Sequence, residues 1–225
     1  MLVKYTRIAM VIALTNLSTI LATYIYVTAG LRQEVFIELN KLKEEVTITN
    51  SLRNNEEVRM SVVEAIKNLS AKSGSKLNIE QIVEVTEVIM EKYKLHGIKP
   101  SLAISIITNE SSFDPKAMSP ANAKGLMQVM DSTARPYLAN YGVAWNTEVL
   151  FDPVVNTRVA LDYLQNLHEI HVAEGLEQND DYTVSLLRYN RSQQATDKLL
   201  EDPLGLQYTA RINQTQTEIR KGGVI

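Results

Sequence analysis

The sequence predicts a mainly α-helical protein built from three consecutive parts. Apolar residues recur at spacings of three and four, several of these segments begin at a helix-capping residue, and no segment shows the alternation of a strand convincingly. A chain of 225 residues holds one sizeable domain with accessory segments. We expect a transmembrane anchor or signal segment at residues 1–31, a helical stalk with a hinge at 32–76, and a helical domain at 77–225.

The N-terminal part is a long uncharged apolar run. Lys4 and Arg7 precede it, and it extends from Ile8 to Leu31. About 20 apolar residues are enough to span a bilayer, and signal-peptide cores are shorter, so the run favours an uncleaved anchor. A cleaved signal remains an alternative because small residues occupy 27–29, and a buried helix in a larger assembly is a third. For an anchor or a signal, the basic residues stay cytoplasmic and the rest of the chain is exported.

The second part is charged and favours helix. Its apolar residues follow a short 4-3-4 spacing typical of a coiled-coil seam: Val35, Leu39, Leu42 and Val46. Thr49 and Arg53 then interrupt this seam, which predicts two short helices or a broken stalk rather than one long coil. A spacer is favoured over an oligomerisation segment. The Gly- and Ser-containing residues 71–76 predict a flexible hinge.

The third part contains recognisable helix starts and stops. Asn78 is expected to cap a helix through Tyr93, and Ser101 to cap the next helix, which ends at Glu110. Asp or Ser precedes the later apolar stripes, and Pro153 fits the first position of one helix. Further helices are expected over residues 131–141, 152–171, 181–190 and 209–225, the last with a frayed end.

Composition limits the classes of partner. The formal net charge is −3 and no block of Lys and Arg occurs, which disfavours a nucleic-acid partner. Cysteine is absent, which excludes disulfides and thiolate metal sites and leaves the redox compartment undetermined. His96, His168 and His171 lack an acidic partner at metal-site spacing, so no metal and no cofactor are expected.

Glu110 is the strongest candidate for chemistry. It closes the apolar segment 102–109 and opens the polar segment 111–115. Apolar walls disfavour the ionised carboxylate and raise its pKa, which is what a general acid needs near neutral pH.

The residues around Glu110 form a motif set. In order, these are Glu-Ser-Ser-Phe-Asp-Pro at 110–115, Ser119, Gly-Leu-Met-Gln-Val-Met at 125–130, and Tyr189-Asn190. Over roughly Leu77 to Ser192 the chain thereby resembles the soluble lytic transglycosylases, the peptidoglycan-cleaving relatives of goose-type lysozyme. The resemblance implies a lysozyme-like helical domain with a substrate cleft.

The resemblance also implies the chemistry. One Glu protonates the glycosidic oxygen between MurNAc and GlcNAc, the substrate's acetamido group stabilises the cation, and the same Glu then takes the proton of the 6-hydroxyl, leaving a 1,6-anhydro end. Glu110 takes this catalytic role here. Ser119, Met127, Gln128, Tyr189 and Asn190 are the expected substrate-binding residues. Tyr189 is also expected to hold Glu110 through its hydroxyl group.

Two positions depart from the family pattern. Arg191 stands where a small residue is usual, and Asp131 where Pro is frequent. Arg191 would lower the pKa of Glu110 if the two paired. We expect it instead to face solvent or an anionic peptide stem of the substrate.

Together these features predict a membrane-anchored enzyme exported to the bacterial periplasm or cell envelope, or held in a virion membrane. Its partners would be peptidoglycan strands, the membrane, and a secretion, conjugation or phage assembly that needs a local opening in the wall. The alternatives are a non-catalytic glycan-binding scaffold subunit and a lysozyme-type hydrolase. Retention of Glu110 with Gln128 and Tyr189 favours the enzyme.

Overall fold

The computed structural model describes the backbone of residues 2–178, 181–191 and 196–225. Side chains are described over the same ranges except at residues 2–15, 34, 196 and 197. Every regular element in these ranges is a helix, and β-type pairing there is limited to isolated bridges from Lys124 to Met118 and Val129. The predicted mainly α class is therefore confirmed.

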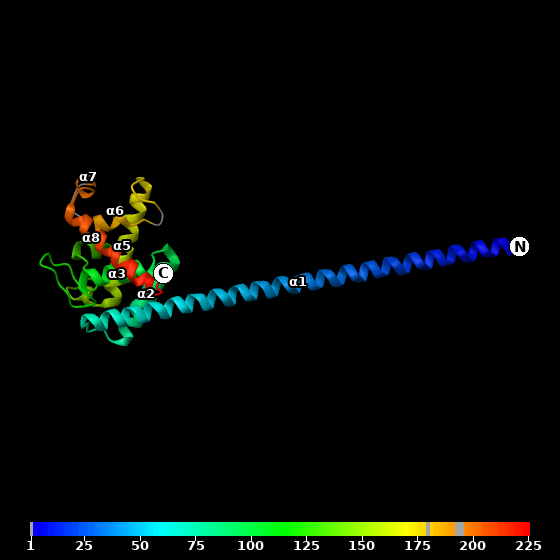
Figure 1. Ribbon diagram of the computed structural model, residues 1–225, viewed down its shortest axis with the longest axis horizontal. Helices are drawn as coiled ribbons and strands as arrows, with labels where there is room; N and C mark the ends of the chain where they lie inside the picture. The colour runs from blue at the N-terminus through cyan, green and yellow to red at the C-terminus, as the bar shows by residue number, and fades with distance from the viewer. Residues whose placement is uncertain (1, 179–180, 192–195) are drawn as a thin grey trace. The chain divides into compact units, whose positions relative to one another are not determined.

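The helices are drawn in Figure 1. Their bounds are α1 (Leu2–Ser73), α2 (Ile79–His96), α3 (Pro100–Ser111), α4 (Asp131–Leu138), η1 (Ala139–Tyr141), η2 (Val149–Phe151), α5 (Pro153–Ala173), α6 (Thr183–Asn190), α7 (Thr196–Leu199) and α8 (Pro203–Lys221). The chain divides into two compact units, Met1–Asn55 and Glu56–Ile225. We call the second unit the helical domain.

The described residues of the first unit all belong to α1. In the part of the chain with described side chains, no helix combines the length and the apolar character that a membrane crossing requires. The predicted anchor at Ile8 to Leu31 begins within residues 2–15, whose side chains lie outside that part.

The predicted break in the stalk is wrong, because α1 continues without interruption to Ser73. Helix hydrogen bonds do not depend on the apolar seam, so Thr49 and Arg53 leave the helix intact. Lys41 and Glu38 form an i,i+3 pair with 3.8 Å between Nζ and Oε2, a spacing at which charged side chains meet on a helix surface.

The domain begins earlier than the predicted boundary at Leu77. Val62 and Ile66 of α1 are completely buried in the domain core. The guanidinium of Arg59 also lies 3.1 Å from the carboxylate of Glu87 in α2. Val62 and Ile66 are four residues apart, so they lie on the same face of α1, and the domain core covers that face. Residues 56–73 are therefore part of the domain rather than of a spacer.

The predicted hinge at residues 71–76 is an ordered helix end. Gly74 has φ +71°, its N–H donates to the carbonyl of Ala71 at 3.3 Å, and the N–H of Ser75 donates to that of Ser70 at 2.9 Å. This pair of bonds is the Schellman pattern, in which a left-handed glycine closes a helix. Glycine therefore sets a defined reversal of the chain here, where the sequence suggested flexibility.

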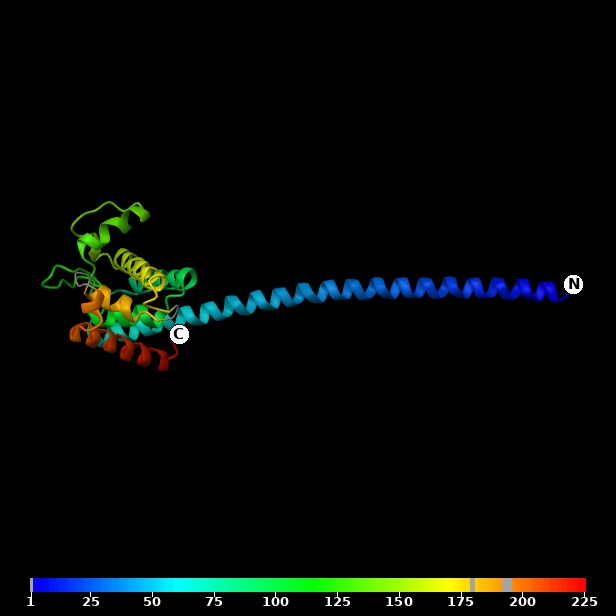
Figure 2. The ribbon, with the colours of Figure 1, turned by 90° about the horizontal axis from the view of Figure 1, so that it is seen from above.

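The central helix of the domain is α3. Its residues from Pro100 to Ile107 are all buried, and Ala103, Ile104, Ile106 and Ile107 are completely so. A helix that is apolar all round must be covered all round. Figures 1 and 2 show α8 running beside α3, and these two helices share the most extensive contact in the domain.

Several predicted helix starts are confirmed. Asn78 and Gln81 form a reciprocal capping box at the start of α2, and Gly97 ends that helix in the left-handed conformation. The carboxylate of Asp152 accepts the N–H groups of Val154 and Val155 at 2.9 and 3.0 Å, with Pro153 in the first turn of α5.

Other ends differ from expectation. The cap of α3 is Lys99, and the N–H of Ser101 instead donates to the carbonyl of Ile225 at 3.0 Å. The last helix starts at Pro203, where Asp202 caps it, rather than at Thr209. Its end is packed rather than frayed, because Val224 is buried against the core.

Candidate active site

Glu110 lies in the last turn of α3, where the buried helix reaches the wall of a cleft. The cleft has a volume of about 720 Å³. It is lined by Glu110, Ser119, Ala121, Ala123, Gln128, Met130, Ser132, Thr133, Pro136, Tyr137, Tyr163, Asn166, Tyr189 and Asn190. Of the predicted site residues, the structure brings Glu110, Ser119, Gln128, Tyr189 and Asn190 together here.

The environment of Glu110 suits an acid that holds its proton. Burial raises the pKa of its carboxyl group to about 7, and this is the largest influence on it. A hydrogen bond from Tyr208 and the positive charge of Arg211 act in the opposite direction. A pKa near the working pH suits a group that donates a proton in one step and accepts one in the next.

Tyr208 of α8 holds the carboxyl group. Its hydroxyl donates to Oε1 of Glu110 at 2.6 Å. Burial raises the pKa of the Tyr208 hydroxyl well above its usual value, so this group remains a donor. No motif marks Tyr208 in the sequence, because the contact depends on the packing of α8 against α3.

Tyr189 has a different role from the predicted one. Its hydroxyl donates to the carbonyl of Met127 at 2.7 Å, and the bond to Glu110 belongs to Tyr208. Tyr189 thereby ties α6 to the loop that carries Gln128.

Met127 is placed beneath the cleft rather than on its surface. The side chain is completely buried in the core, so it does not present a surface for substrate. Its N–H donates to Oδ1 of Asn156 at 2.8 Å, and Asn156 Nδ2 donates to the carbonyls of Lys124 and Leu150 at 2.7 and 2.9 Å. Asn156 is a buried residue of α5 that motif analysis missed. Its hydrogen bonds hold the loop at residues 125–128, which we call the cleft loop.

The loop at residues 125–128 needs unusual backbone geometry. Gly125 has φ +75°, and a Cβ there would lie 2.2 Å from the carbonyl oxygen of Leu150. Gln128 also has positive φ, at +51°, and such conformations cost about 1–3 kcal/mol in a non-glycine residue. Its side-chain Nε2 donates to the carbonyls of Ala117 and Gly125 at 3.2 and 3.0 Å. Among the described residues none donates to the amide oxygen of Gln128, and this oxygen is the part suited to accept from a sugar hydroxyl.

Ser119 lines the cleft and forms two hydrogen bonds with Ala123. Its hydroxyl accepts the N–H of Ala123 at 3.0 Å, and its own N–H donates to the carbonyl of Ala123 at 2.9 Å. The bond from Ala123 uses only an acceptor site of the Ser119 hydroxyl, so its O–H can donate to a substrate group in the cleft.

Three tyrosines with neighbouring rings line the cleft. The ring of Tyr163 lies 6.3 Å from that of Tyr137 and 5.5 Å from that of Tyr189, measured between centroids. Asn166 donates to the hydroxyl of Tyr137 at 2.9 Å. Tyr137, Tyr163 and Asn166 were not predicted, because none of them belongs to the motif set and only the folding of α4 and α5 brings them to the cleft.

Both departures from the family pattern have partners within the protein. Arg191 pairs with Asp202, the cap of α8, with 2.9 Å between Nε and Oδ2. It therefore neither pairs with Glu110 nor simply faces solvent, and the cation that lowers the pKa of Glu110 is Arg211. Asp131 binds the Nζ of Lys124 through both carboxylate oxygens, at 2.8 and 3.0 Å.

The three histidines do not converge on the cleft. His168 and His171 lie in a buried network with Glu177 and Ser185, in which the His168 Nδ1 is 3.0 Å from a Glu177 oxygen. Burial lowers the pKa of His171. In the described part of the chain no cluster of three potential ligands is arranged to hold a metal ion.

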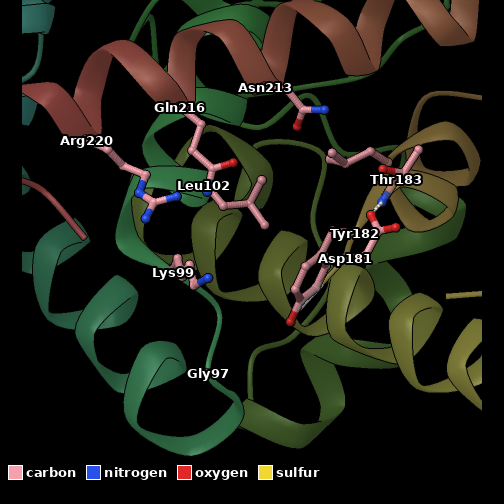
Figure 3. A pocket seen from close by; sticks show the side chains of 10 residues that line it. Gly97, Lys99, Leu102, Asp181, Tyr182, Thr183, Asn213, Gln216 and Arg220 are labelled. Atoms are coloured by element: carbon pink, nitrogen blue, oxygen red, sulfur yellow. Dashed lines mark hydrogen bonds between the residues drawn. The ribbon is translucent and has the colours of Figure 1, made fainter. Parts of the chain in front are cut away.

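A second pocket, of about 160 Å³, is drawn in Figure 3. Lys99, Arg220, Gln216 and Asn213 reach it from one side and Asp181 and Tyr182 from the other. None of the motif residues lines this smaller pocket, so the cleft with Glu110 is the candidate active site.

Comparison with known proteins agrees with this geometry. Residues 87–200 match the family described as the transglycosylase SLT domain. A membrane-bound lytic murein transglycosylase C of Cronobacter sakazakii is 33% identical over 88 residues, covering 38% of this chain and 24% of that protein. The protein of the same name from Haemophilus influenzae is 37% identical over 99 residues, covering 39% of this chain and 28% of that protein.

The chain thus spans about a quarter of the length of the curated relatives that it matches. The family match itself covers half of the chain, and it includes Glu110 and the whole lining of the cleft. This chain belongs to the transglycosylase SLT domain family.

Proposed function

We propose that this chain is a lytic transglycosylase that cleaves the β-1,4 bond between MurNAc and GlcNAc in peptidoglycan. The observation that carries the proposal is the carboxyl group of Glu110, which faces the cleft with a pKa raised to about 7. The names of the relatives, membrane-bound lytic murein transglycosylases, support the same substrate.

The proposed reaction uses Glu110 twice. Its proton passes to the glycosidic oxygen as the bond from that oxygen to C1 of MurNAc breaks, and the acetamido oxygen stabilises C1. The Glu110 carboxylate then takes the proton of the 6-hydroxyl while O6 bonds to C1. The products are a free GlcNAc end and a 1,6-anhydro-MurNAc end, Glu110 is protonated again, and no water is consumed.

The cleft favours this route over hydrolysis by two carboxylates. Glycosidases of that kind place a second carboxyl group roughly 5 to 9.5 Å from the acid. Among the described residues that line the cleft, Glu110 is the one carboxylic acid. In the proposed route the substrate's acetamido group stabilises C1 and its 6-hydroxyl group attacks C1, so no second carboxylate is needed as a base or nucleophile.

The proposed substrate contacts follow from the lining of the cleft. The Gln128 amide oxygen and the Ser119 hydroxyl face sugar hydroxyl and acetamido groups, and Asn190 adds a second amide. Met127 contributes through its carbonyl, which fixes Tyr189, and not through its side chain.

Product analysis tests the proposal. The full chain is incubated with purified peptidoglycan, and the released muropeptides are analysed by mass spectrometry. We expect ends in 1,6-anhydro-MurNAc. Reducing MurNAc ends would replace the proposal by a lysozyme-type hydrolase, and binding of glycan without any product would replace it by a scaffold subunit.

We further propose that the enzyme acts at the cell envelope, opening the wall locally for secretion, conjugation or phage infection, with Ile8 to Leu31 as its membrane attachment. The uncharged apolar run in the sequence and the membrane-bound relatives support this location. After expression in bacteria, the chain is expected to stay in the membrane pellet in alkaline carbonate and to be released by detergent. Recovery in the carbonate-soluble fraction would contradict the attachment.

A further inference from the structure

Residues 73–75, at and just after the end of α1, contact residues 112 and 113, which follow shortly after Glu110. The hydroxyl of Ser75 donates to the carbonyl of Phe113 at 2.6 Å. The hydroxyl of Ser73 lies 2.8 Å from the carbonyl of Ser112 and 2.9 Å from that of Ser70, so its single proton is shared between them. Two serines of one short segment thus meet two consecutive carbonyl groups in the turn that follows α3.

That turn has backbone conformations that side chains rarely adopt. Ser112 and Phe113 have φ values of +50° and +65°, and neither is glycine. Conformations of this kind persist only where the surroundings hold them, and they concentrate at functional sites. Phe113 is held through its buried ring, and the serine hydroxyls hold the carbonyl side of the same turn.

The segment that supplies these hydroxyls is itself fixed in place. Val62 and Ile66 anchor the preceding turns of α1 in the core, and the closure around Gly74 turns Ser75 back toward the domain. The Ser75 hydroxyl also accepts the N–H of Leu77 at 3.1 Å. The donor to Phe113 is therefore positioned before any substrate is bound.

We propose that Ser75, supported by Ser73, is a positioning residue for catalysis: residues 73–75 hold the left-handed turn at Ser112 and Phe113 and thereby fix the direction in which Glu110 points into the cleft. Both serines lie outside residues 87–200, the part that matches the family. The inference rests on the proposed function for its kinetic consequence, while its structural consequence is measurable without any activity.

The kinetic test uses the full chain with the Ser75→Ala substitution, soluble glycan strands as substrate, and a temperature well below the unfolding midpoint. Misplacing a catalytic group by about 1 Å can cost about 100-fold in rate, so we expect kcat to fall about tenfold or more while KM changes less than about twofold. Ser75→Thr keeps the hydroxyl and is expected to restore kcat.

The matched control is Ser61→Ala. Ser61 is a part-buried serine within α1, and its hydroxyl donates to the carbonyl of Val58 in the same helix. We expect wild-type kcat for this variant. An unchanged kcat in Ser75→Ala, no rescue by Thr, or an equal loss in Ser61→Ala would each overturn the proposal.

Hydrogen exchange separates this inference from the proposed function. The N–H of Asp114 donates to the carbonyl of Ser111 at 3.1 Å across the turn, and its exchange is expected to speed up about tenfold in Ser75→Ala. If the wild-type chain makes no product, the proposed function fails and this exchange rate still decides the positioning role. Unchanged exchange at residues 112–114 would refute that role even in an active enzyme.

Discussion

Replacing Glu110 by Gln is expected to lower kcat on peptidoglycan by about 100- to 10,000-fold, the range that general acid–base groups contribute. Gln has nearly the same shape and keeps an oxygen for the Tyr208 hydroxyl, but it has no carboxyl proton to donate and cannot take one back. In the wild-type enzyme, kcat should decline above about pH 7 as the carboxyl group with its raised pKa loses its proton. Retention of more than a tenth of the wild-type kcat in Glu110→Gln would exclude Glu110 as the acid.

A stability measurement provides the folding control for this variant. The folded-state pKa of Glu110, about 7, is higher than the value of 4.5 for an unperturbed Glu, so the folded state binds the proton more tightly. Wild-type stability should therefore fall as the pH rises from about 4.5 to about 7, by up to about 3 kcal/mol. Gln does not titrate, so urea unfolding should find Glu110→Gln more stable than the wild type at pH 8. Lower stability of the variant at pH 8 would mean that burial does not penalise the Glu110 carboxylate.

The second large effect is expected for Tyr208→Phe. This change removes the hydroxyl that donates to Glu110 Oε1 at 2.6 Å. Hydrogen bonds to charged groups are worth about 1.5–3 kcal/mol, so we expect kcat at neutral pH to fall about tenfold as the carboxyl group loses its orientation. The lost bond favoured the carboxylate, so the pKa of Glu110 should rise further and the alkaline limb of the kcat profile should move to higher pH.

Tyr189→Phe is the matched control for the pH profile. Its hydroxyl bonds to the carbonyl of Met127 and not to Glu110. The change is expected to lower activity through the cleft loop and to leave the alkaline limb where it is in the wild type. A limb that moves upward with Tyr189→Phe and stays in place with Tyr208→Phe would assign the carboxyl partner to Tyr189, as the sequence suggested.

Local chemistry explains why much of the domain could be predicted. Asn78 and Asp152 bond to backbone N–H groups two or three residues ahead, so their sequence context alone identifies the starts of α2 and α5. Glu110 was recognisable for a similar reason, because the apolar run before it and the motif after it lie within one short stretch. Interactions between residues that are close in the chain can be predicted from the sequence.

The missed features depend on contacts between distant segments. Tyr208 meets Glu110 across 98 positions, and Ser75 meets Phe113 across 38. Arg191 finds its partner only because Asp202 caps a helix that packs beside α6.

Residue order therefore indicated most helices of the domain, the candidate acid and the family motif, since each depends on neighbours along the chain. Packing of helices determined which hydroxyl holds Glu110, and it placed the Met127 side chain beneath the cleft. Packing also made the end of α1 part of the domain, since the side chains of Val62 and Ile66 stabilise the folded state only where other helices bury them. A pattern of residues shows that a face is apolar, but the partner that covers this face is determined by the assembled fold.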